Sequence, residues 1–223
     1  MIRLAVSRAF AHIACFTVIL FSLAGHAFAQ DNQVLANAPD LKVGDRWEYV
    51  RKDIFTGDEL GRFSIELTDI VGDTATFRRT TSTGEPSSSF KSKLDGSVQF
   101  QRDGTSYSFK PLVFPLTRGA TWESTSRGIN PGGHPIRNYV ERHVSGVETL
   151  STPCGVLKVI RIDGSGYWEN MDPQHRKYRA GIEETLWYSP EMKRIVKTRV
   201  ISQAGTGGWP VGAEDNLVSC SVR

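Results

Sequence analysis

The sequence predicts a mainly β protein built from antiparallel strands. Apolar and polar residues alternate with period two over residues 63–68 and again over 98–101, which is typical of half-buried strands. Paired Gly and Asp residues separate such runs at hairpin spacing, as at Gly57-Asp58, Gly72-Asp73 and Asp95-Gly96. No stretch after Gln30 keeps apolar residues at helical spacing for three turns, so we expect little helix, at most a turn near residue 30.

Further strands are predicted by runs of β-branched and aromatic residues. These runs occupy residues 46–55, 74–81, 156–162, 184–188 and 194–201.

The first 29 residues have the organisation of a cleavable signal peptide. Arg3 and Arg8 precede an apolar run over residues 13–24, and a small-x-small site at 27–29 precedes polar residues. The apolar run is about 12 residues long, against the roughly 20 that span a bilayer. We therefore expect export, cleavage after Ala29 and a periplasmic mature chain of residues 30–223 without stable membrane insertion. His26 stands where a lipoprotein would need a cysteine.

The charge of the mature chain is nearly balanced. Of 27 basic residues the predicted signal holds two, and it holds none of the 24 acidic ones. The resulting formal charge of 25 − 24 = +1, without a basic stripe, gives no electrostatic case for nucleic acid as a partner.

A sequence motif occurs twice, 75 positions apart. Leu41-x-x-Gly44-x-x-Trp47-Glu48 is repeated as Leu116-x-x-Gly119-x-x-Trp122-Glu123, and strand-like runs follow each copy. The sequence therefore predicts two related β-units, about 41–115 and 116–203, with a C-terminal segment 204–223. Chance similarity between strand sequences is the alternative.

Two cysteines, Cys154 and Cys220, remain after signal removal. Because the periplasm allows disulfides to persist, we expect these cysteines to pair and to tie the C-terminal segment to the body. The alternative is a catalytic or redox thiol, which would need a nearby His or a closely spaced second Cys. Neither occurs around Cys154.

Three segments carry a resemblance to known proteins, at residues 41–49, 152–162 and 186–197. They resemble the loosely defined TapB-like group and related exported bacterial β-proteins. The resemblance implies a curved antiparallel sheet or half-barrel. It brings no set of catalytic residues and no cofactor, so none is assigned. Cys154 departs from the small Ala or Ser that is commoner at this position, which again suggests a local disulfide.

No pattern in the mature chain predicts catalysis or a metal site. His134, His143 and His175 lack the spacing of zinc ligands. The sequence Gly164-Ser165-Gly166 lacks the Gly-x-Ser-x-Gly elbow of serine hydrolases and is expected to end a strand. Glu183 and Glu184 would point to opposite faces of a strand and could not act together in a glycosidase.

Aromatic residues are the best candidates for a binding surface. Trp47 and Trp122 are expected to be equivalent core anchors, whereas Tyr167 and Trp168 should lie at a hairpin tip beside the charged loop 169–179. We therefore predict binding through Tyr167, Trp168 and Tyr178.

Two functions fit these features. The first is a non-enzymatic periplasmic binding module for an apolar ligand or a cell-envelope partner. The second is a structural or accessory protein of an envelope assembly that makes contact through an exposed sheet edge. A hydrolase ranks third. The first function predicts an apolar cavity, and the second predicts a filled core with an exposed strand or aromatic patch.

Overall fold

A computed structural model gives the fold of residues 33–82, 88–102, 105–129, 135–171, 178–204 and 210–223. The predicted signal peptide and its cleavage site lie outside these residues, as do His134 and His175. Within the described segments no helix is long and apolar enough to cross a membrane.

The described residues form fourteen strands and no helix. The strands are β1 (Val34–Ala36), β2 (Arg46–Asp53), β3 (Glu59–Val71), β4 (Thr74–Thr81), β5 (Ser88–Lys93), β6 (Val98–Arg102), β7 (Thr105–Phe109), β8 (Leu116–Thr117), β9 (Thr121–Ile129), β10 (Pro135–Thr152), β11 (Gly155–Asn170), β12 (Arg179–Ser189), β13 (Arg194–Ala204) and β14 (Val211–Ser221).

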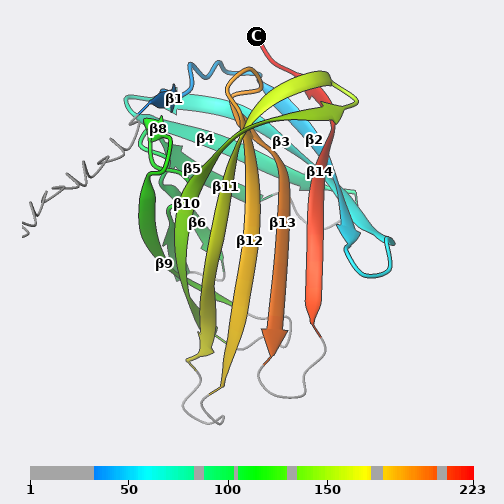
Figure 1. The fold of residues 1–223 in the computed structure, drawn as a ribbon. Coiled ribbons are helices and arrows are strands. Elements are labelled where there is room, and N and C mark those ends of the chain that lie inside the picture. The colour runs from blue at the N-terminus through cyan, green and yellow to red at the C-terminus, as the bar shows by residue number, and fades with distance from the viewer. Residues whose placement is uncertain (1–32, 83–87, 103–104, 130–134, 172–177, 205–209) are drawn as a thin grey trace, which may run out of the picture. The chain divides into compact units, whose positions relative to one another are not determined.

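Twelve of the strands form one antiparallel sheet that curves into a half-barrel (Figure 1). Its order is β7-β6-β5-β4-β3-β2-β14-β13-β12-β11-β10-β9. The first arm, β2 to β7, and the second arm, β9 to β14, are both meanders of sequential hairpins. They join through the β2–β14 ladder, so β7 and β9 end the sheet at its two borders. The predicted curved antiparallel sheet is confirmed.

Strands β1 and β8 pair separately as a two-stranded sheet. The helical turn expected near residue 30 is wrong for the described part of that region, because β1 occupies it. Pairing with β8 and burial of Ala36 and Leu116 explain the strand.

The strands predicted from alternation and from β-branched runs are all present, but β1, β5, β7, β8, β9 and β14 were not predicted. β14 carries Asp215 on the same face as Leu217, and this mixture hides the apolar period. The expected strand end at Gly164-Ser165-Gly166 is also wrong, since β11 continues to Asn170. Neighbouring strands pair with both glycines, which keeps the ladder intact.

Register assigns one face of each strand to the inside of the half-barrel. Cross-strand partners share a face. Leu186 pairs with Thr198, Thr198 with Asp215 and Asp215 with Arg51. Arg51 lies two residues from Tyr49 in β2, so Leu186 and Tyr49 lie on the same face of the sheet.

This inner face carries most of two clusters of buried apolar side chains. The first gathers around Trp47, Leu67 and Phe77, and the second around Leu116, Ile162 and Tyr188. The β10–β11 hairpin adds Leu157 and Val159 to the first cluster from the other face of β11.

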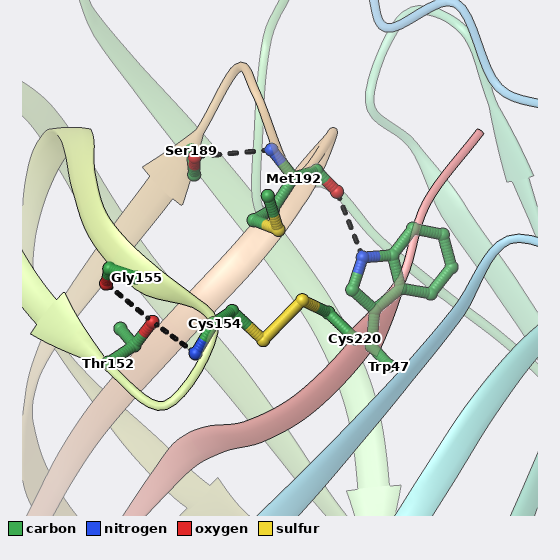
Figure 2. Close-up of a disulfide and its surroundings, with 7 residues drawn as sticks. All are labelled: Trp47, Thr152, Cys154, Gly155, Ser189, Met192 and Cys220. Carbon is green, nitrogen blue, oxygen red and sulfur yellow. Dashed lines mark hydrogen bonds between the residues drawn. A yellow bond between two sulfur atoms is a disulfide. The ribbon is translucent and has the colours of Figure 1, made fainter.

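The tip of the β10–β11 hairpin is fastened to β14. Cys154 forms a disulfide with Cys220 across a Cα–Cα distance of 6.2 Å (Figure 2), as the cysteine count predicts. Cys154 lies in the hairpin turn, where its amide donates to the Thr152 hydroxyl at 3.1 Å. Both cysteines pack against the cluster around Trp47, so the bridge closes one end of the core.

The two copies of the repeated motif fold alike. Gly44 and Gly119 both adopt positive φ, 93° and 74°, which glycine tolerates best. The Gly44 amide donates to the carbonyl of Leu67, and the Gly119 amide donates to the carbonyl of Val144. A strand starts two residues after each glycine. The division into two units, about 41–115 and 116–203, stays a prediction.

Candidate functional site

The inner face carries a buried ion pair below the apolar clusters. Arg142 of β10 and Glu184 of β12 form this pair, and Gly164 of β11 lies between them in register. A Cβ atom on Gly164 would approach Cγ of Glu184 to 2.6 Å, so glycine leaves the space that the two side chains cross. Arg142 also donates to the carbonyl of Lys110 at 3.4 Å.

A second arginine, Arg194, packs against three aromatic rings of the core cluster around Trp47. Its guanidinium carbon is 5.2, 4.9 and 5.5 Å from the ring centroids of Trp47, Phe77 and Phe90. Burial lowers the pKa of Arg194, and the Tyr49 hydroxyl opposes that shift. The guanidinium still remains charged at neutral pH, because an arginine starts from a very high pKa. This arrangement belongs to the core.

The predicted binding residues are divided between two faces. Trp168 lies on the inner face, half-buried, where its indole N–H donates to the Ser202 hydroxyl at 2.8 Å. The ring of Tyr178 is 5.1 Å from that of Trp168. Tyr167 points the other way, because successive residues of a strand alternate faces. The structure therefore brings Trp168 and Tyr178 together and separates Tyr167 from them.

Tyr167 belongs to an outer surface of tyrosines and arginines. Its ring is 4.8 Å from the ring of Tyr139 on β10, and the Arg179 guanidinium lies 3.9 Å from the Tyr167 centroid. Arg137 donates to the Tyr139 hydroxyl at 3.0 Å, which raises the pKa of the guanidinium. At neutral pH this surface therefore presents fixed positive charge beside flat aromatic rings.

Register extends this surface across four strands as one row of charged side chains. Arg127 of β9 pairs with Arg137 of β10, Arg137 pairs with Glu169 of β11, and Glu169 pairs with Arg179 of β12. Glu169 lies 4.0 Å from Arg137 and 3.4 Å from Arg179. Arg127 is exposed and has no ion pair with any carboxylate in the described part of the chain. Arg137 and Arg179 thus share one carboxylate, and Arg127 extends the row with a further cation.

A cleft of about 410 Å³ adjoins this row where the two borders of the sheet meet. We call the line between β7 and β9 the seam. The cleft is lined by residues of β7, β9 and β10, namely Tyr107, Ser108, Thr125, Ser126, Arg127, Arg137 and Tyr139. We call these residues, together with Tyr167 and Arg179, the seam surface. The lining holds two arginines and no carboxylate.

Sequence reasoning missed most of the seam surface. It named Tyr167 and the charged loop 169–179, which contains Arg179, but not Arg127 or Arg137, because the row depends on the register of four strands. The one local signal is the i, i+2 spacing of Arg137 and Tyr139, which puts both on one strand face.

A second cleft, of about 230 Å³, lies over β2, β3 and β4. It is lined by Glu48, Tyr49, Arg62, Phe63, Ser64, Thr80, Thr81, Ser82 and Val218. Its charged residues include both signs, so it offers no field of one sign to a ligand.

Ser145, His143 and Asp163 meet on the outer face, a grouping that the sequence did not indicate. The Ser145 hydroxyl donates to Asp163 at 2.5 Å and lies 3.3 Å from Nδ1 of His143. This order differs from a catalytic triad, in which the histidine stands between serine and aspartate. Burial opposes ionisation of Asp163, but hydrogen bonds from Ser145, Arg161 and Thr185 outweigh it and lower the pKa of the carboxyl. The group therefore works as a surface hydrogen-bond network.

No group of three or more His, Cys, Asp or Glu side chains in the described segments could hold a metal ion.

Comparison with known proteins relates the chain to others through its fold. No family model and no curated protein matches the sequence, so the resemblance to the TapB-like group stays a prediction. Among solved structures, the chain is similar to an exported protein with a YmcC-like fold from Bacteroides fragilis NCTC 9343. The TM-score is 0.52 at 12% identity, over 83% of this chain and 99% of that one.

A lipoprotein from Parabacteroides distasonis ATCC 8503 is also similar. The TM-score is 0.51 at 10% identity, over 85% of this chain and 100% of that one. At such low identity the likeness concerns the fold alone. The half-barrel is thus an architecture that this chain shares with these two proteins over most of its length.

Proposed function

We propose that the protein is a non-enzymatic binding module of the cell envelope, and that its seam surface holds an acidic segment of a partner protein. The observation that carries this proposal is the cleft at the seam, with two arginines, two tyrosines and no carboxylate in its lining. Arginine pairs with carboxylates in a planar, bidentate geometry, and tyrosine supplies rigid contact area. Both residue types are common at protein interfaces.

An apolar small ligand fits the described residues less well than a polar partner. The inner face is occupied by two clusters of buried side chains at its apolar end. Further along, the same face carries the Arg142–Glu184 and Arg51–Asp215 pairs. Both clefts contain charged side chains, whereas sites for apolar ligands are lined mainly by hydrophobic groups.

The proposal includes export to the periplasm, with cleavage after Ala29. Support comes from the charged, apolar and small-residue regions of the first 29 residues and from the disulfide, which persists in an oxidising compartment. Intact mass spectrometry of protein purified from the periplasm tests the cleavage. A mass that begins at a residue other than Gln30 would place the site elsewhere.

Peptide binding tests the function. The probe is a fluorescent peptide in which glutamate and threonine alternate. It has about eight residues, which is a usual strand length. The control probe has lysine in place of each glutamate. We expect the glutamate peptide to bind and the lysine peptide not to bind. Binding should weaken as salt rises, because exposed charges are screened.

Variants then locate the site. The double variant Arg127→Gln, Arg137→Gln should bind the glutamate peptide with an affinity lower by about tenfold or more, since each arginine supplies a charge-assisted contact. Arg78→Gln is the matched control, because Arg78 is an exposed arginine of β4 that pairs with Glu66. An unchanged dissociation constant in the double variant, or equal binding of both peptides, would refute the proposal.

A further inference from the structure

The two border strands of the sheet face each other without pairing. Within the described residues β7 pairs with β6 and β9 pairs with β10, and no ladder joins β7 to β9. The backbone N–H and C=O groups on one edge of each strand therefore point into the seam. Such a row of unpaired groups is a template on which another strand can form.

The seam is fastened at one end and open further along. The Lys110 amide, just after β7, donates to the Ser124 hydroxyl at 3.0 Å. The Lys110 carbonyl accepts from the indole of Trp122 at 3.0 Å. The cleft begins beyond this fastening, with Tyr107 and Ser108 on one side and residues 125–127 on the other. The backbone of β9 is thus open to the cleft from Thr125 onward.

β9 lacks several of the devices that usually protect a border strand, although Glu123 and Arg127 give it two exposed charges. It is nine residues long and pairs with β10 in continuous register from Thr121 to Ile129, without a bulge. It contains neither proline nor lysine. Proteins commonly blunt free edges with these residues, with bulges or by making the edge strand short. β9 is therefore a regular strand whose outer edge carries no ladder. Because β7 lies beside that edge, a strand added to β9 takes the place that β7 now borders.

Charge identifies the occupant that this edge would take. The side chains beside the open part of the seam include exposed Arg127, which has no ion pair in the described chain, and Arg137. The cleft lining supplies no carboxylate. An extended segment with acidic side chains on one face would place its carboxylates opposite these cations while its backbone pairs with β9.

We infer that an acidic, extended segment of a partner protein adds as a strand to the unpaired edge of β9, beside Arg127 and Arg137, and displaces β7 from that edge. The inference rests on the proposed function and gives it a binding mode, β-strand addition. Main-chain hydrogen bonds would supply part of the affinity, and the arginines would select acidic sequences.

Backbone methylation of the probe tests the mode. In a strand, all residues whose side chains share a face also direct their N–H and C=O groups to the same edge. Two versions of the glutamate–threonine peptide are therefore made, one N-methylated at the glutamates and one at the threonines. We expect one version to lose about tenfold or more in affinity and the other to bind like the parent, because only one set of amides faces β9.

Hydrogen exchange on the full chain gives an independent readout. Binding of the parent peptide should slow amide exchange in β9, and the version that fails to bind should leave it unchanged. Equal binding of both methylated peptides with unchanged exchange in β9 would overturn strand addition and leave recognition by side chains alone. Failure of every acidic peptide to bind would instead refute the proposed function.

A second copy of the chain is the competing occupant. Sedimentation equilibrium without peptide should give a monomer over the concentrations used for binding. A concentration-dependent dimer that dissociates when the glutamate peptide is added would assign the edge of β9 to self-association and overturn the inference.

Discussion

Trp47 and Trp122 occupy the same position in the two copies of one motif, yet the structure uses them differently. Trp47 is fully buried, and its indole donates to the Met192 carbonyl at 2.9 Å (Figure 2). Trp122 is half-buried, and its indole donates to the Lys110 carbonyl beside the seam. The motif provides a glycine turn and a strand start in both places. The strands that pack around each tryptophan therefore decide whether it is fully buried in the core or partly exposed at the border of the sheet.

This difference separates a stabilising end of the molecule from the end at which we propose that binding occurs. Around Trp47, three strands of the first arm meet the β12–β13 turn and the disulfide. Near Trp122, the border strands β7 and β9 do not pair with each other in the described part of the chain. Stability is therefore expected to concentrate near Trp47, and recognition near the seam.

The largest expected effect comes from truncating the two tryptophans. Trp47→Ala should lower the free energy of unfolding by about 3 to 5 kcal/mol, because it empties a fully buried site. Trp122→Ala should cost about 1 to 2 kcal/mol, since the side chain is only partly buried and one hydrogen bond is lost. Urea denaturation, monitored by circular dichroism, measures both losses. The dependence of the unfolding free energy on urea concentration should be the same in wild type and variants, which makes the comparison valid.

Equal losses in the two variants would erase the proposed distinction. In that case Trp122 would be a core anchor like Trp47, as the sequence alone suggests.

The disulfide gives the next effect. The chain between Cys154 and Cys220 spans 66 positions, and the chain-entropy model assigns about 4 kcal/mol to a loop of that size, with measured values commonly from about 2 to 4. Cys154→Ser should destabilise the protein by this amount relative to the oxidised wild type, while reductant should remove the difference. Wild-type protein that is equally stable with and without reductant would argue against any contribution of the bridge.

Local sequence determined much of the fold, and its failures have a common cause. Period-two alternation found β3 and β6, and β-branched runs found β2, β4 and β13. The alternation failed in β14, where Asp215 faces inward. That position is tolerable because Arg51 of β2 donates to Asp215 at 2.7 and 2.8 Å, a partner about 160 residues away that no local pattern reveals.

The candidate site was less predictable than the fold. Tyr167 was identified because aromatic residues draw attention, but its relation to Trp168 was misjudged as one shared loop surface. Both lie in β11 and point to opposite faces. The charge row from Arg127 to Arg179 requires the registers of β9 to β12 to be known together. Such registers follow from tertiary packing, to which a single sequence gives no direct access.

The smallest expected effect lies at the proposed binding end, in the β5–β6 turn. The Ser97 hydroxyl donates to Asp95 at 2.7 Å and the Ser97 amide donates at 2.9 Å, and these bonds lower the pKa of Asp95 to about 2. Lys110 lies 3.1 Å from the same carboxylate, and the Phe114 amide donates to the Asp95 carbonyl. The turn thereby supports the segment that fastens the seam.

Because the folded pKa lies below the unfolded value of 3.8, the ionised carboxylate stabilises the fold above about pH 4 and loses that contribution as pH falls toward 2. Half of the Asp95 side chain is exposed, so solvent screening keeps the effect below about 1 kcal/mol. Asp95→Asn should remove this part of the acid sensitivity, measured as the difference between melting temperatures at neutral and low pH. If wild type and variant lose the same stability on acidification, the turn does not depend on the charge of Asp95, and the fastening of the seam must come from Trp122 and Ser124 instead.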